Sequence, residues 1–142
     1  MYSRSLVFAQ FSLIGLMVVY SRGIFTSWIG LSILFSGVLF GYWAIRHNRG
    51  GNFNIRPDLK EGCELITTGP YHFVRHPMYT SVTLMALALA VTTPTYLQWS
   101  SLALLIAVLA LKALREERLW CEGSEVYKVY MTKTKRFIPF IY

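Results

Sequence analysis

Residues 23–45 read GIFTSWIGLSILFSGVLFGYWAI, a long stretch that is almost wholly apolar and holds no charged side chain. A helix that crosses a membrane needs about 20 such residues, so this stretch predicts one membrane span. Over the whole chain of 142 residues, 54% of the side chains are hydrophobic and only 15% are charged. Soluble domains carry about 25% charged residues. The composition therefore predicts a protein that is surrounded by a bilayer.

Three further apolar segments lie on either side of this stretch, at residues 6–20, 78–92 and 97–111. They are shorter than a full span, but flanking Ser, Thr and Tyr can extend them by a turn. The sequence TTPTY between the last two predicts a tight turn between antiparallel helices. The first segment has no small-residue cleavage site after it, so we expect it to be a retained helix rather than a signal peptide.

The sequence therefore predicts an all-α, polytopic integral membrane protein with about four transmembrane helices. We expect one membrane domain over residues 1–142, with two helices in residues 1–45 and a loop, a helical hairpin and a tail in residues 46–142. Residues 112–130 have the composition of an amphipathic helix that leaves the membrane, with a break expected at Gly123 and Ser124. Earlier in the chain, within the loop after residue 45, Leu65 and Ile66 predict a brief strand or an extended run.

Lysine and arginine are unevenly distributed between the segments. They gather in the loop after residue 45 and in the tail after residue 111, whereas the two short turns hold only Arg22. Cytoplasmic loops carry the excess of positive charge, so the N-terminus, the long loop and the tail are predicted to face the cytoplasm. Attraction to lipid headgroups also explains the net charge of +7 without a nucleic-acid partner. Cys63 and Cys121 both fall on this reducing side, where we expect no disulfide.

Gly37 and Gly41 form a GxxxG motif in the second segment. Small residues four apart allow another helix to approach closely. The motif is typical either of packing within one chain, which we favour in a four-helix protein, or of a homodimer interface. Monomer and homodimer both remain open at this point.

The polar run GPYHFVRHPMY, residues 69–79, stands where the third segment begins. Pro77 suits the first turn of a helix, which places His76 near the N-cap, where free amides and the helix dipole can hold an anion. Arg75 adds a full charge, and the rings of Tyr71 and Tyr79 attract cations such as a sulfonium. The alternative is that Arg75 and Tyr79 are interfacial anchors. His72 and His76 lack a nearby third ligand, so no metal site is expected.

A second polar group, Arg115-Glu116-Glu117-Arg118, follows the fourth segment. It is either a solvated helix face with local ion pairs or part of a composite site. In an antiparallel hairpin the start of the third segment and the end of the fourth are adjacent, so one carboxylate could turn towards residues 69–79.

Residues 63–142 resemble the isoprenylcysteine carboxyl methyltransferase family and its prokaryotic relatives. The resemblance rests on RHPMY, the Glu116–Glu117 pair and the closing GSEVYKVYMTKTKRFIPFIY. It implies a membrane enzyme that uses S-adenosylmethionine. It also implies that the cofactor contacts Leu65, Ile66, Tyr71, His76, Pro77, Met78, Tyr79 and a glutamate that is either Glu116 or Glu117. Lys112 stands near the family's substrate-side arginine, and Arg75 and Glu116 are the candidate catalytic residues.

The predicted function is therefore methyl transfer from S-adenosylmethionine to a lipophilic or prenylated acceptor that enters from the bilayer, at a site facing the cytoplasm. A carboxylate acceptor needs no general base, whereas an amine or a thiol would have to lose a proton to Glu116, Glu117 or His76. The acceptor itself stays open between a prenylcysteine, a phospholipid amine, a thiol and a quinone-like lipid. Two alternatives are a small membrane reductase that uses NADPH and a non-catalytic lipid-binding protein.

Overall fold

The computed structural model describes residues 2–48, 58, 62 and 64–138. These residues fold into five α-helices and form no strand, which confirms the predicted all-helical class. The helices are α1 (Tyr2–Val19), α2 (Trp28–His47), α3 (Pro77–Thr92), α4 (Tyr96–Gly123) and α5 (Glu125–Lys133), and the 3-10 helix η2 (Gly69–His72) precedes α3. Part of the basic loop after residue 45 lies outside the described residues, including Arg49, Arg56, Lys60 and Cys63, on which predictions fall.

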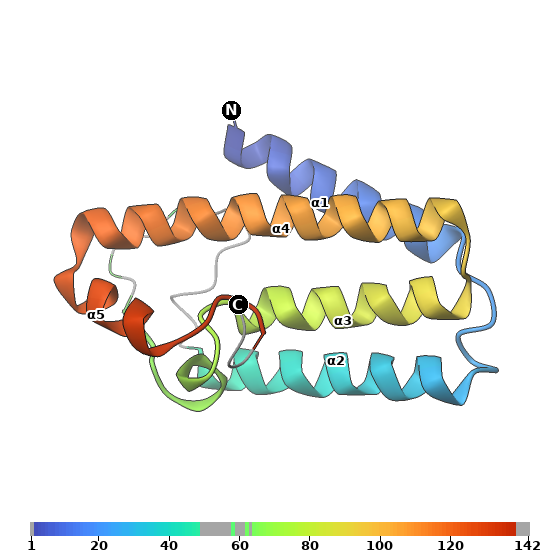
Figure 1. The fold of residues 1–142 in the computed structure, drawn as a ribbon, viewed down its shortest axis with the longest axis horizontal. Coiled ribbons are helices and arrows are strands. Elements are labelled where there is room, and N and C mark those ends of the chain that lie inside the picture. Colours follow the sequence, from blue (N-terminus) through green and yellow to red (C-terminus); the bar gives the residue numbers. More distant parts are fainter. Residues whose placement is uncertain (1, 49–57, 59–61, 63, 139–142) are drawn as a thin grey trace.

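Helices α2, α3 and α4 lie side by side with alternating directions, and α1 crosses α4 obliquely (Figure 1). The two short turns meet at one end of the bundle. There the backbone amide of Arg22 donates to the hydroxyl of Thr93 and that hydroxyl donates back to the carbonyl of Arg22, both over 2.7 Å. The opposite end holds η2, α5 and the end of α4 (Figure 1). This arrangement is the antiparallel hairpin that the TTPTY turn predicts.

The contact between α2 and α3 uses the small residues of the GxxxG motif. Ser81 donates to the carbonyl of Gly37 over 2.7 Å, and a Cβ at Gly41 would collide with the side chain of Ser81. The motif therefore serves packing within the chain, as we favoured. Helix α2 begins at Trp28, later than the predicted Gly23, because Ser27 caps it by accepting from the amide of Gly30. Gly23, with φ of +77°, belongs to the turn before it.

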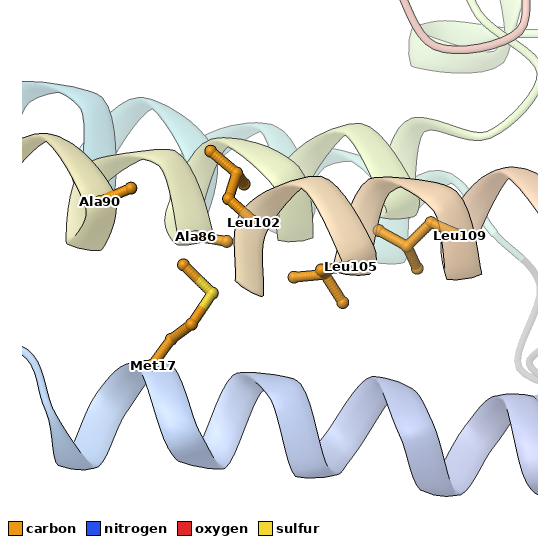
Figure 2. Close-up of a cluster of buried hydrophobic side chains, with 6 residues drawn as sticks. All are labelled: Met17, Ala86, Ala90, Leu102, Leu105 and Leu109. Atoms are coloured by element: carbon orange, nitrogen blue, oxygen red, sulfur yellow. The ribbon is translucent and has the colours of Figure 1, made fainter. Parts of the chain in front are cut away.

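A hydrophobic core fills the space between α1, α3 and α4 (Figure 2). Met17 reaches from α1 towards alanines of α3 and leucines of α4, and the six buried members are Met17, Ala86, Ala90, Leu102, Leu105 and Leu109. Large apolar side chains also cover the outside of the bundle, among them Phe8, Phe35, Tyr42 and Leu104. A surface so rich in exposed apolar side chains suits contact with lipid rather than water.

Helices α2 and α4 are long and apolar enough to cross a membrane by length and composition. Their 20 and 28 residues correspond to about 30 and 42 Å at 1.5 Å per residue, against a hydrocarbon core of about 30 Å. The other two predicted spans are apolar helices of 18 residues (α1) and 16 residues (α3). The prediction of four spans is therefore supported for two helices and stays a prediction for the others.

Helix α4 continues without interruption through the segment that we expected to be a separate amphipathic helix. It ends at Gly123, and Ser124 caps α5 by accepting from the amide of Tyr127, so the break lies where the sequence predicts it. The extra turns carry Lys112, Glu116 and Glu117 beyond the hydrophobic core to the start of α3. Of the two alternatives predicted for Leu65 and Ile66, the strand does not form, and both residues lie in irregular chain before η2.

Candidate functional site

The start of α3 has the predicted geometry. His76 is the N-cap residue and Pro77 occupies the first helical position. The backbone amides of Arg75 and His76 donate to the carbonyls of Lys135 and Arg136, over 2.8 and 3.1 Å. The chain before α3 and the chain after α5 thus run beside each other in parallel. Because the tail already engages these amides, fewer of them are available to an anionic ligand than the sequence suggests.

Glu117 is the buried centre of the site, with a side chain that is 4% exposed. Its carboxylate accepts from Nε of Arg75 over 2.8 Å and from Nη2 of Arg136 over 2.7 Å. Nε2 of His76 lies 3.2 Å away. A carboxylate with partners on three sides is fixed in place, and it joins α4, the start of α3 and the tail.

Glu116 faces the same space but is less enclosed, with 21% of its side chain exposed. The hydroxyl of Tyr79 donates to it, and Nδ1 of His76 lies 3.4 Å away. Neither acid pairs with its arginine neighbours in the described part of the chain. Arg115 binds Asp58 and Arg118 binds Glu122 instead. We call Arg75, His76, Tyr79, Glu116, Glu117 and Arg136 the acid cluster.

His76 stands between the two acids, with one ring nitrogen directed at each. Burial lowers the pKa of His76, but its hydrogen bonds and charge interactions with Glu116 and Glu117 outweigh burial and hold the pKa above its usual value. A protonated imidazole donates from both nitrogens, which matches two carboxylate neighbours. The histidine is therefore the bridge between the enclosed acid and the more exposed one.

Aromatic rings surround the cluster. His76 and Tyr79 are stacked with ring centroids 5.4 Å apart, and Phe137 from the tail packs against both at 5.9 and 6.4 Å. Burial and the charge of Glu116 raise the pKa of Tyr71 to about 12, so this phenol stays neutral. The carbonyl of Tyr71 accepts from the hydroxyl of Tyr130 in α5. The ring faces of Tyr79 and Phe137 thus lie beside the carboxylate of Glu116.

Lys112 lies one helical turn before Glu116, and its side chain is buried. Its Nζ donates to Oε1 of Gln10 in α1 over 2.6 Å and stands 5.1 Å from the ring centroid of Tyr79. The predicted site residues Arg75, His76, Tyr79, Glu116, Glu117 and Lys112 are therefore brought together from α3, α4 and the two residues before α3. Leu65 and Ile66 are half-buried, and no hydrogen bond or ring contact among the described residues joins them to the cluster.

Sequence reasoning missed Gln10, Arg136 and Phe137. Gln10 is a lone amide in an apolar segment and carries no motif. Arg136 and Phe137 are in the closing stretch that supports the family resemblance, and a cation and an aromatic ring together in that stretch were a usable signal. Their contacts were not predictable, because no spacing rule connects the tail with residues 73–76.

A family model described as phospholipid methyltransferase matches residues 13–128, which is most of the chain. The chain belongs to the phospholipid methyltransferase family. This is the same family as that of the isoprenylcysteine carboxyl methyltransferase-like proteins, so the resemblance is confirmed. A comparison with curated proteins finds no match.

Membership in the phospholipid methyltransferase family implies a membrane methyltransferase that acts on lipid. It favours this activity over a reductase. The matched region includes α2, α3, α4 and both glutamates, whereas Gln10 lies before it and Arg136 after it. That the cluster binds a cofactor stays a prediction.

Proposed function

We propose that the protein transfers a methyl group from S-adenosylmethionine to a lipophilic acceptor that reaches the site from the bilayer. The observation that carries the proposal is Glu116, a carboxylate with an exposed fraction of 21% that stands beside the rings of His76 and Tyr79 at the open end of the α3–α4 hairpin. A family that methylates lipids supplies the reaction class.

The chemistry of the cluster fits this cofactor. S-adenosylmethionine carries a sulfonium and an ammonium, and both cations are attracted by ring faces and by carboxylates. Glu116 and the rings of Tyr79 and Phe137 offer both kinds of group within one site. Ribose hydroxyls can donate to the same carboxylate. Tyr71, Pro77 and Met78 are the neighbouring residues that we assign to the walls of the cofactor site, with Leu65 and Ile66 as further candidates.

When bound, the cofactor supplies an electrophilic methyl group. Glu116 would bind its cationic part, and Tyr79 would orient Glu116 through the hydroxyl bond. Glu117 and Arg75 would act as positioning residues, because Glu117 already has partners on three sides and Arg75 is bonded to Glu117 and to the carbonyl of Met131. Lys112 would lie towards the acceptor.

Proton removal depends on the acceptor. A carboxylate acceptor is already ionised, so alignment and exclusion of water are sufficient. An amine has to lose a proton, and Glu117 is a poor base because Arg75 and Arg136 stabilise its charged form. Both ring nitrogens of His76 are directed at the two acids, so neither is free to take a proton from the acceptor. Glu116 is then the group that would accept the proton.

Equilibrium binding of radiolabelled S-adenosylmethionine to the purified protein in detergent tests the proposal, with NADPH as the competing ligand. We expect binding of S-adenosylmethionine alone. Glu116→Gln removes the proposed charge-assisted hydrogen bond between this side chain and the cofactor. Such a bond is worth about 1.5–3 kcal/mol, so the affinity for S-adenosylmethionine should fall roughly 10- to 150-fold. His76→Ala and Tyr79→Phe should also weaken binding.

The matched control is Arg118→Gln, which removes a charge on an exposed face of the same helix, where Arg118 pairs with Glu122. It should bind like the unmodified protein. Unchanged affinity in the Glu116, His76 and Tyr79 variants would mean that the cluster is structural. Absence of any binding by the unmodified protein would favour a non-catalytic lipid-binding role.

The site would face the cytoplasm. Arg75, Arg115, Arg136 and the basic residues of the tail lie at the end of the bundle that holds the cluster, whereas the two short turns at the other end hold only Arg22. The positive-inside bias supports this orientation.

A further inference from the structure

A buried lysine in α4 contacts both the first helix and the acid cluster. The side chain of Lys112 is almost fully enclosed, with the residue 1% exposed, and α4 is one of the two helices suited to crossing a membrane. Ionisable side chains in such helices are costly to bury and are usually retained for function. The ammonium of Lys112 donates to Oε1 of Gln10 in α1 over 2.6 Å.

The same ammonium acts on the Tyr79–Glu116 pair. Nζ lies 5.1 Å from the centroid of the Tyr79 ring, within the range of a cation–π contact. It also lies within the electrostatic field of Glu116, which accepts from the hydroxyl of Tyr79. This one cation therefore interacts with both the ring that orients Glu116 and the Glu116 carboxylate.

We propose that Gln10 is a positioning residue of the cofactor site, which holds the ammonium of Lys112 against Tyr79 and so keeps the Tyr79–Glu116 pair in its binding geometry. The inference rests on the proposed function, because it assigns Glu116 to the cofactor. Gln10 comes from α1 and precedes the region of the family match, which begins at residue 13.

Gln10 is chemically suited to this role. A lysine side chain is a flexible stem with a point charge at its end, so it needs a fixed acceptor to stay in one place. The amide oxygen of Gln10 is such an acceptor and is itself buried. Because the amide is neutral, it fixes the ammonium without adding a negative charge that would compete with Glu116 for it.

The competing explanation is that the Gln10–Lys112 bond only ties α1 to α4. The chain offers a matched control for this. Gln98 in α4 is also buried, and its Nε2 donates to the carbonyl of Met17 in α1 over 2.9 Å. This second glutamine joins the same two helices near the short turns, away from the cluster. Gln10→Leu and Gln98→Leu therefore remove comparable contacts at the two ends of one interface.

The test measures the dissociation constant for radiolabelled S-adenosylmethionine and the unfolding temperature of each variant in detergent. Both leucine variants should unfold at a lower temperature than the unmodified protein. Gln10→Leu should bind the cofactor about 3- to 30-fold more weakly, as expected for residues coupled within one polar network, whereas Gln98→Leu should bind normally. If Gln10→Leu does not fold, Gln10→Asn, which is too short to reach Lys112, carries the same expectation.

The second arm repeats Gln10→Leu in a Lys112→Met background. If Gln10 acts through Lys112, the second substitution should weaken binding no further. Normal affinity in Gln10→Leu, or the same loss in Gln98→Leu, would overturn the inference while leaving the proposed function intact. An additive loss in the Lys112→Met background would also overturn it. Failure of the unmodified protein to bind S-adenosylmethionine would remove the proposed function and this inference together.

Discussion

Replacing Glu117 by glutamine should destabilise the fold far more than the same change at Glu116. Glu117 receives bonds of 2.8 Å from Arg75 and 2.7 Å from Arg136, and His76 lies 3.2 Å away. Glutamine keeps the shape but removes the charge, so the partly buried guanidinium groups of Arg75 and Arg136 lose the carboxylate charge of Glu117. Breaking a buried ion pair in this way costs about 3–5 kcal/mol.

That loss is a large part of the total stability of a protein, which is about 5–15 kcal/mol. For a chain of this length, 1 kcal/mol corresponds to roughly 2–4 °C, so the unfolding temperature of Glu117→Gln should fall by about 6–20 °C. Glu116→Gln keeps an oxygen that can accept from Tyr79, and the side chain is partly exposed, so its shift should be about 1 kcal/mol or less, while its main effect falls on cofactor affinity.

Thermal unfolding of the two variants, monitored by circular dichroism in the same detergent, compares their stabilities directly. Equal unfolding temperatures for Glu117→Gln and the unmodified protein would refute the assignment of Glu117 as the buried centre of the cluster. A larger loss in Glu116→Gln than in Glu117→Gln would reverse the assigned roles of the two acids.

Three other outcomes are expected. Gly41→Leu should separate α2 from α3 and lower the unfolding temperature, because its side chain would collide with Ser81, whereas Gly15→Ala, with open space around it in α1, should not lower it. The pKa of His76 is raised in the folded state, so its stabilising effect is full below about pH 6.5 and is lost as the pH rises through the raised value. Unfolding temperatures measured across that range should decline in the unmodified protein and less steeply in His76→Gln. In a background without Cys63 and Cys121, a cysteine at Thr95 should react with a membrane-impermeant reagent in intact cells, and labelling only after lysis would contradict the proposed orientation.

Most of the helical fold could be predicted because its signals are local. Apolar length indicated the helices, TTPTY indicated the hairpin turn, and Pro77 indicated the start of α3. The helix boundaries were less accurate, since the start of α2 depends on capping by Ser27 and α4 continues past its apolar part. Neither effect has a strong sequence pattern.

The approach of the acidic pair to residues 75–79 was also predictable, because antiparallel helices bring the start of one beside the end of the next. The opposite roles of the two acids were not. Neighbouring residues on a helix point about 100° apart, so one acid had to be more enclosed than the other. Only the positions of Arg75 and Arg136 decide that the enclosed acid is Glu117.

The pairing of residues 73–76 with residues 135–136 has a consequence for how the protein is made. Both acids leave the ribosome before Arg136, and Arg75 leaves before either. Glu117 can therefore meet Arg75 once the α3–α4 hairpin has formed, but its second arginine arrives only when the tail pairs with residues 73–76. In this interval the hairpin holds a carboxylate that is only partly neutralised.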